Sequence, residues 1–187
     1  NDEKALFDNM WQKCYAVIAC CNTIIEKCDE NKAGLSPVWK GSIKGEALAL
    51  RAMLHFDMLR LFGPLTFELD KESIPYQTNS DQTVTPLLSG SEVIGLILDD
   101  LKNAVGLLKH TDPYFVEEEF SDTDLNYRRF RMNYFAAKGL MARVQLWGGD
   151  KEKAAATAKE VIAEGQAEGA EFFPFVTNSE ATSSNPY

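Results

Sequence analysis

Side chains capable of acid–base chemistry occur in a few short groups along the chain. Asp99 and Asp100 are adjacent, so on a helix they point to different sides and cannot flank one glycosidic bond as acid and nucleophile. His55 and Asp57 are two residues apart, which places them about 200° apart around a helix axis and excludes a local relay. The acidic run 117–119 is typical of a solvated loop. The sequence contains no Gly-x-Ser-x-Gly, His-Glu-x-x-His or phosphate-loop motif, and it therefore predicts a protein that is not an enzyme.

Four cysteines, Cys14, Cys20, Cys21 and Cys28, lie within one segment of helical periodicity. Three of them are seven residues apart, about 10.5 Å along a helix, whereas a disulfide needs Cα atoms within about 7 Å. Their spacing also fails to match a zinc site. We expect small buried hydrophobic residues on one helix face, with no metal site and no cofactor.

Aromatic and amide side chains in the expected loops could bind a sugar. The C–H face of a pyranose ring stacks on aromatic rings, and amides bond to its hydroxyls. A packing role is the alternative for each of these residues, since no motif ties them to a ligand. The candidates are Trp39, Tyr76, Gln77, Asn79, Tyr114, Phe115 and Tyr127.

The composition excludes some partners. The 187 residues are 45% hydrophobic and 25% charged, which is typical of a globular protein. Nineteen basic and 28 acidic residues give a net charge of −9, so nucleic acid is not an expected partner. No apolar run approaches the roughly 18 to 20 residues needed to span a bilayer, and the chain is expected to be soluble. It begins at Asn1 without a signal segment, so any targeting peptide is expected to lie outside this sequence.

Helical periodicity covers most of the chain, which predicts an all-α fold. The segment 65–88 contains two prolines and is expected to be a long irregular crossing, and 111–127 is expected to be a second loop. Gly-Pro at 63–64 is expected to end the helix before it. The expected helices run over 2–29, from 38 or 44 to 62, from 89 or 91 to 110, over 133–147 and over 151–164.

The last two expected helices, within 130–164, have the pattern of a tetratricopeptide repeat. A short Gly-Gly-Asp turn makes them antiparallel neighbours, and Ala142, Ala154 and Ala158 are small where the helices would cross. Lys138 stands where the repeat has an aromatic residue, and a generic helical hairpin would also fit.

A sharper pattern occupies residues 45–64. This stretch reads Gly-Glu-Ala at 45–47, Arg-Ala at 51–52, Phe-Asp at 56–57, Arg60 and then Gly-Pro. The sequence resembles the SusD/RagB family over roughly residues 1–175. The resemblance rests on this stretch, on four residues near the N-terminus and on an Arg-Met-Asn motif that precedes Ala-Ala. The N-terminal set is Trp11, Tyr15, Ile18 and Asn22, and the later motif is Arg131-Met132-Asn133 before Ala136-Ala137. The sequence departs from the family at His55, where an aromatic is common, and in lacking a second proline after Gly63-Pro64-Leu65.

The charged residues of this stretch are interpreted as structural. Arg51 lies on an otherwise apolar face and needs a carboxylate or helix-end carbonyls if it is buried. We expect Glu46 and Arg51 to be clamps between helices, and Asp57 and Arg60, three residues apart, to pair on one face.

The resemblance implies a fold and a function. The fold would be an all-α stack of helical hairpins of tetratricopeptide-like (SusD-like) architecture with long irregular loops, with 1–187 forming a single N-terminal domain of a longer protein. The function would be non-catalytic binding of oligosaccharides at the bacterial outer membrane and their delivery to a SusC-like TonB-dependent transporter. The protein would be a surface lipoprotein that meets the membrane only through a lipid anchor absent from this chain.

One alternative is a helical-repeat scaffold that binds a peptide or partner protein in a concave groove. It predicts Asn, Lys and Arg along the groove, and this acidic chain offers few basic residues. A glycosidase would be recognised by turnover of a bound glycan.

Overall fold

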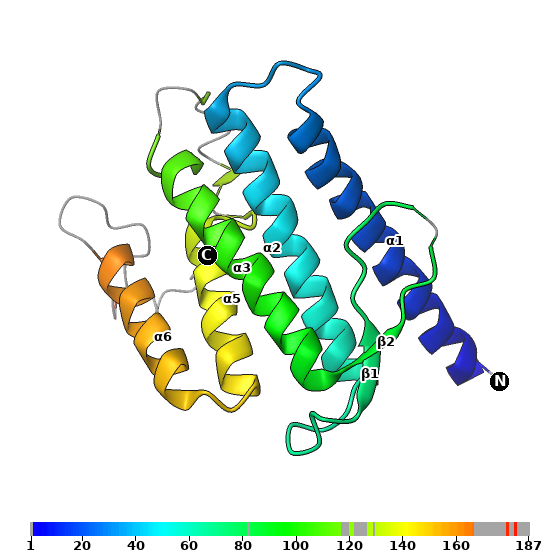
Figure 1. The fold of residues 1–187 in the computed structure, drawn as a ribbon. Helices are drawn as coiled ribbons and strands as arrows, with labels where there is room; N and C mark the ends of the chain where they lie inside the picture. Colours follow the sequence, from blue (N-terminus) through cyan, green and yellow to red (C-terminus); the bar gives the residue numbers. More distant parts are fainter. Residues whose placement is uncertain are drawn as a thin grey trace.

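The computed structural model describes residues 2–81, 83–116, 120–121, 127–128, 130–166, 179 and 182. The described part is mainly helical, which confirms the expected all-α class. Figure 1 shows α2 and α3 side by side, with α1 along the other side of α2 and α5 and α6 following beyond α3. Among the described helices, none is long and apolar enough to span a bilayer. The helices are α1 (Asp2–Glu30), α2 (Pro37–Phe62), α3 (Gly90–Thr111), α5 (Tyr134–Trp147) and α6 (Lys151–Gly165).

Local capping residues set where the two central helices begin. Ser36 accepts a hydrogen bond from the Trp39 amide (3.3 Å) and starts α2 one residue before the earlier of the two expected starts. Ser89 forms a reciprocal capping box with Glu92 and starts α3. Gly63 ends α2 in an extended conformation, and a Cβ atom there would lie 2.5 Å from the Leu59 carbonyl oxygen. Close approach of the backbone, rather than a positive φ, therefore requires glycine.

The segment expected to be irregular throughout contains two short strands. β1 (Glu72–Pro75) and β2 (Leu87–Ser89) pair antiparallel, with Glu72 opposite Ser89 and Pro75 opposite Leu87. Strands of four and three residues are too short for a period of two to stand out, which is why the sequence pattern missed them. The pair joins the C-terminal end of α2 to the N-terminal end of α3 (Figure 1).

The core lies between α2 and α3, where small residues let the two helices approach closely. A Cβ atom at Gly45 would lie 2.8 Å from Leu108 Cγ, so glycine permits this contact. The side chains that are fully buried along the two helices include Ala49, Ala52, Leu59, Ile97, Leu101, Ala104 and Leu108.

Three of the four cysteines lie toward the core side of α1. Cys21 and Cys28 are buried, Cys14 is half-buried, and Cys20 is exposed. The expectation that all four are buried is thus wrong for Cys20, because its neighbour Cys21 already takes the inward direction and the next residue on a helix points about 100° away. Burial raises the pKa of the Cys21 and Cys28 thiols, which makes them poor nucleophiles.

The helices α5 and α6 pack against each other across the short turn. Lys138, where a tetratricopeptide repeat has an aromatic, is buried and joins the two helices. Its ammonium lies 2.9 Å from both carboxylate oxygens of Glu164 and 3.0 Å from Glu160 Oε2, and it donates to the Tyr134 hydroxyl at 3.3 Å. Burial opposes the charge, but the bonds to Glu164 and Glu160 raise the pKa of Lys138 on balance. An ion pair therefore joins the two helices at the position where a tetratricopeptide repeat has an aromatic residue.

Candidate functional site

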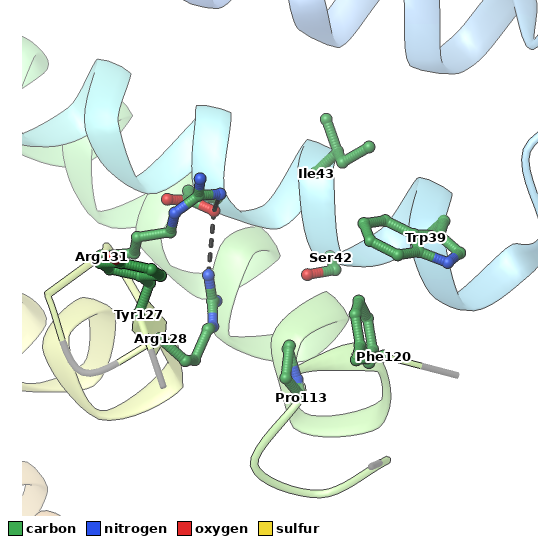
Figure 2. Close-up of a pocket in the computed structure, with 9 residues that line it drawn as sticks. Trp39, Ser42, Ile43, Pro113, Phe120, Tyr127, Arg128 and Arg131 are labelled. Atoms are coloured by element: carbon green, nitrogen blue, oxygen red, sulfur yellow. Dashed lines mark hydrogen bonds and ion pairs between the residues drawn. The ribbon is translucent and has the colours of Figure 1, made fainter. Parts of the chain in front are cut away.

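A cleft of about 150 Å³ opens between the N-terminal half of α2 and the chain that follows α3. Its aromatic, polar and charged side chains converge from segments far apart in the sequence (Figure 2). The volume is below the range of about 300 to 1,000 Å³ typical of whole small-molecule sites, so the cleft has room for part of a ligand. The lining residues are Trp39, Ser42, Ile43, Glu46, Pro113, Phe120, Tyr127, Arg128 and Arg131; we call this the Trp39 cleft.

Aromatic rings stand at both ends of the Trp39 cleft. Trp39 and Phe120 lie together at one end, with ring centroids 4.6 Å apart and planes inclined by 53° (Figure 2). Tyr127 lies at the other end, and 61% of its surface is exposed. Rings presented in this way can stack on the apolar face of a sugar.

The polar side of the cleft is built around Glu46. Arg128 Nη1 donates to Glu46 Oε2 at 2.9 Å, and Arg131 Nη1 lies 4.0 Å from the same oxygen. The Arg128 side chain is buried, whereas 64% of the Arg131 side chain is exposed. Glu46 thus joins α2 to the segment that carries Arg128, as expected of a clamp, and Arg131 keeps donors facing solvent.

Asp112, at the end of α3, fixes the position of Arg128. Arg128 donates through Nε to Asp112 Oδ1 (3.0 Å) and through Nη2 to Asp112 Oδ2 (2.7 Å). The same carboxylate accepts the backbone amides of Tyr114 (3.1 Å) and Tyr134 (2.8 Å), and Asp112 is fully buried. Burial opposes the guanidinium charge, but Asp112 and then Glu46 raise the pKa of Arg128 on balance. The wall of the cleft is therefore preorganised.

A second buried ion pair lies between α2 and α3. Arg51 donates through Nε and Nη2 to the two oxygens of Asp100, both at 2.7 Å, and through Nη1 to Asn22 Oδ1 at 2.8 Å. Tyr76 adds its hydroxyl to Asp100 Oδ2 at 2.7 Å. Arg51 thus finds a carboxylate, as its place on an apolar face requires, and Asp57 and Arg60 form the expected surface pair at 3.1 Å.

Polar side chains of α1 and α2 bind the backbone of residues 75–80, which we call loop 75–80. Tyr15 donates to the Pro75 carbonyl at 2.9 Å, and Asn22 donates to the carbonyls of residues 77 and 79 at 3.2 and 2.7 Å. Arg51 donates to the carbonyl of residue 78 at 3.3 Å, and Glu26 accepts the amide of residue 80 at 2.8 Å. The loop is therefore held to the helices mainly through its own main chain.

His55 belongs to the same set of contacts and is held in one neutral tautomer. Its Nδ1 lies 2.9 Å from the Arg51 carbonyl oxygen, which can only accept, so Nδ1 carries the proton. Nε2 then accepts the Gln77 amide at 3.0 Å. The ring also stacks on Tyr76 with centroids 3.9 Å apart. Burial is the main cause that lowers the pKa of His55 to about 4.

This pKa predicts a loss of stability in mild acid. An unfolded histidine binds a proton near pH 6.5, whereas folded His55 does so only near pH 4. The unfolded chain therefore gains a proton first, and the free energy of unfolding falls by about 3 kcal/mol between these two pH values. Urea unfolding of the wild type and of His55→Gln at a series of pH values isolates this term. Above about pH 6.5 the difference in the free energy of unfolding between the two proteins should be constant. Between pH 6.5 and pH 4 the wild type should lose about 3 kcal/mol relative to His55→Gln. A difference that stays constant down to pH 4 would contradict the prediction.

The structure brings two of the seven candidate sugar-binding residues together. Trp39 and Tyr127 line the same cleft. Tyr114 and Phe115 lie beside the start of α5, where they contact the Phe135 ring at 6.2 and 5.9 Å between centroids.

The other three candidates belong to loop 75–80. Tyr76 is 4% exposed and gives its hydroxyl to Asp100, so it serves packing, which corrects its place among the ligand candidates. Gln77 donates to Asn79 Oδ1 at 2.5 Å and accepts the Thr85 hydroxyl, which orders the loop internally. Neither Gln77 nor Asn79 lines the Trp39 cleft.

Sequence reasoning missed Phe120 and Arg131 as cleft residues and gave Glu46 only a structural role. Arg131 opens the Arg-Met-Asn motif, and Phe120 is an aromatic within an acidic loop, so both carried a signal. The sequence held no signal that Phe120 and Arg131 line one cleft with residues of α2 that lie more than 70 positions away. The acidic run 117–119 lies outside the described residues.

Comparison with known protein families matches residues 1–146 to the SusD-like model described as starch-binding and associating with the outer membrane. A SusD-like protein of Bacteroides ovatus is 30% identical over 146 residues, which cover 76% of this chain and 23% of that protein. SusD-like protein P38 of Formosa agariphila is 34% identical over 94 residues, which cover 50% and 17%. The chain thus matches less than a quarter of the length of these curated relatives.

Solved structures share the fold. A SusD superfamily protein from Bacteroides thetaiotaomicron superposes with a TM-score of 0.72 at 23% identity, covering 92% of this chain and 35% of that one. A putative sugar-binding protein from Bacteroides vulgatus gives a TM-score of 0.68 at 27% identity, covering 86% and 34%. A structure described with xylogluco-oligosaccharide superposes with a TM-score of 0.63 at 26% identity, covering 93% of this chain and 32% of that one. The family match over most of the chain confirms the resemblance read from residues 45–64, and this chain belongs to the SusD-like family.

Proposed function

We propose that this chain is part of a protein that binds oligosaccharides at the bacterial outer membrane without cleaving them. The family's description includes starch binding and the outer membrane, and relatives at 26% and 27% identity are described with an oligosaccharide or as sugar-binding. The observation on this chain that carries the proposal is the Trp39 cleft, with aromatic rings at both ends and charged groups between them.

The cleft has the chemistry that a sugar ring needs. Trp39 and Tyr127 offer apolar ring surface, and Glu46 and Arg131 offer an acceptor and donors for hydroxyl groups. Arg128 and Asp112 hold this wall in place before a ligand arrives, so binding costs little reorganisation.

The described carboxylates support a role without catalysis. A glycosidase needs two carboxyl groups facing one bond, about 5 to 9.5 Å apart. Glu46 is the one carboxylate among the described lining residues, and it is ion-paired with Arg128. Incubating the full-length protein with a bound glycan and assaying reducing ends should show no release of new ends.

The partner in this proposal is a SusC-like TonB-dependent transporter, as the resemblance to SusD/RagB proteins implies. The bound oligosaccharide would pass from the helical scaffold to the transporter, and a lipid anchor on the full-length protein would hold it at the cell surface. Purification of the tagged full-length protein from outer membranes should yield the transporter, and its intact mass should include acyl chains. An unlipidated cytosolic protein would contradict this placement.

Truncating the aromatic rings tests the cleft itself. Trp39→Ala in the full-length protein should weaken binding of a xylogluco-oligosaccharide about 30-fold, because it removes a stacking surface worth about 2 kcal/mol. Isothermal titration calorimetry measures the change. Tyr127→Ala should act in the same direction, and it is the safer variant for folding because this side chain is mostly exposed. Phe67→Ala, which removes an exposed ring outside the cleft, is the control. Binding equal to the control in both variants would remove the cleft from the ligand site.

A second candidate function is binding of a peptide or partner protein. It is favoured by an open groove of about 520 Å³ between α5 and α6, whose wall includes Ala142, Ala158 and Ile162. Ala142→Glu would place a charge on this wall. If this variant loses a protein partner while its affinity for the glycan is unchanged, the second function is favoured. If it loses affinity for the glycan and keeps the protein partner, the first function is favoured.

A further inference from the structure

A basic hollow of about 490 Å³ lies at the C-terminal end of α2, far from the Trp39 cleft at its N-terminal half. Three of its lining residues are cations and none is a carboxylate, although the chain as a whole has a net charge of −9. It is lined by Phe56, Arg60, Thr66, Arg143, Leu146, Trp147, Gly149 and Lys151; we call it the basic hollow.

Arg60 is held in place at the hollow by three contacts. Its guanidinium carbon lies 5.5 Å from the centre of the Phe56 ring and 5.9 Å from the Trp147 ring. Its Nη1 donates to Asp57 at 3.1 Å. Because these contacts orient the fork, Arg60 loses little side-chain freedom when it binds an anion.

Arg143 and Lys151, unlike Arg60, have no carboxylate partner among the described residues. In the part of the chain that the structure describes, neither has a carboxylate within ion-pair distance, and both are exposed. Lys153, two residues further along α6, is by contrast paired with Asp150 at 2.7 Å. Lys151 is also the first residue of α6, where the positive end of the helix dipole disfavours a cation. Two unpaired cations therefore face one hollow in a place that local electrostatics does not favour.

We infer that the basic hollow binds the carboxylate or sulfate group of an acidic saccharide. An oxyanion is what a preoriented guanidinium and two unpaired cations recognise. Leu146 and Trp147 give the hollow an apolar side against which the ring carrying that group can pack. The inference goes beyond the proposed oligosaccharide site, because it uses no residue of the Trp39 cleft and stands if that cleft binds nothing; Arg143, Leu146 and Lys151 do also line the groove between α5 and α6.

Oligogalacturonate and its methyl ester are the probes, and the full-length protein is the sample. Calorimetry at physiological ionic strength should show binding of the acid and at least about tenfold weaker binding of the ester. Arg143→Gln with Lys151→Gln should lower the affinity for the acid by at least about tenfold. The control is Lys102→Gln with Lys159→Gln, two exposed lysines outside the hollow that change the net charge equally. This control should bind within about twofold of the wild type, since remote surface charges are screened by salt.

Four results would overturn the inference. The first is equal affinity of the two double variants for the acid, and the second is equal binding of acid and ester. The third is displacement of the oligosaccharide by an equal concentration of inorganic sulfate, which would make the hollow a site for free anions. The fourth is that Arg143→Gln with Lys151→Gln weakens the binding of an acidic protein partner and leaves the binding of the saccharide unchanged. Titration of Tyr127→Ala with xylogluco-oligosaccharide reports on the Trp39 cleft separately, so the two proposals can fail independently.

Discussion

Asp100→Asn is expected to lower the free energy of unfolding by about 3 to 5 kcal/mol, the usual cost of leaving one member of a buried ion pair without its partner. Arg51 is 6% exposed and has both of its short bonds to Asp100. Burial opposes the guanidinium charge, and the Asp100 carboxylate is what raises the pKa of Arg51 on balance. Asparagine keeps the volume but supplies one acceptor oxygen in place of two, and Tyr76 also loses its charged acceptor.

Urea unfolding followed by circular dichroism measures this change, and the neighbouring residue provides a matched control. Asp99→Asn makes the same chemical change at an exposed position on the same helix and should shift stability by less than about 0.5 kcal/mol. Arg51→Met combined with Asp100→Leu should recover part of the loss, because apolar replacement of both partners removes the unpaired charge. Equal stability of Asp100→Asn and Asp99→Asn would show that the pair contributes nothing.

Asp112→Asn is expected to cost a similar amount, about 3 to 5 kcal/mol, and to weaken the Trp39 cleft as well. The fully buried carboxylate receives two hydrogen bonds from Arg128 and two from backbone amides, and an amide side chain cannot accept all four. Arg128 would then lose its main anchor and keep its bonds to Glu46 and to the Met132 carbonyl, so the wall of the cleft would loosen.

Two measurements on the same variant separate the structural role from the effect on binding. Urea unfolding should show the loss of stability, with Asp70→Asn, an exposed aspartate, as the control. Calorimetry with xylogluco-oligosaccharide, well below the unfolding midpoint, should show affinity reduced by about tenfold or more. A variant as stable as Asp70→Asn would refute the structural role of Asp112, and undiminished affinity in a destabilised variant would mean that the cleft does not depend on this anchor.

The helices were predictable because their signals are local. The cap at Ser89, the stop at Gly63 and the apolar periodicity each act within a few residues. The same holds for the pair between Asp57 and Arg60, which a spacing of three residues brings onto one face of α2. Short strands have no such signal, so β1 and β2 were missed.

The candidate site was predictable only in part, because its contacts are long-range. The need of Arg51 for a carboxylate followed from its apolar surroundings, but the identity of that carboxylate, 49 positions away, did not. Glu46 and Arg128 are 82 positions apart, and no pattern in one chain links them. Side-chain chemistry selected Trp39 and Tyr127, which line the Trp39 cleft, and it also selected the buried Tyr76, because a tyrosine that packs and one that could bind a sugar have the same side chain.

The way loop 75–80 is attached has a consequence for how its sequence can diversify. Asn22, Tyr15 and Arg51 bond to carbonyl oxygens of the loop, and these atoms are present whatever side chain the loop residue carries. Mutations at position 78 can therefore accumulate without cost to the attachment, and a library randomised at this position should yield mostly folded proteins; at position 79 a mutation also removes the bond from Gln77 to the Asn79 side chain. Selection, in nature or in the laboratory, can then act on the exposed side chains of the loop while the helices beneath it stay unchanged.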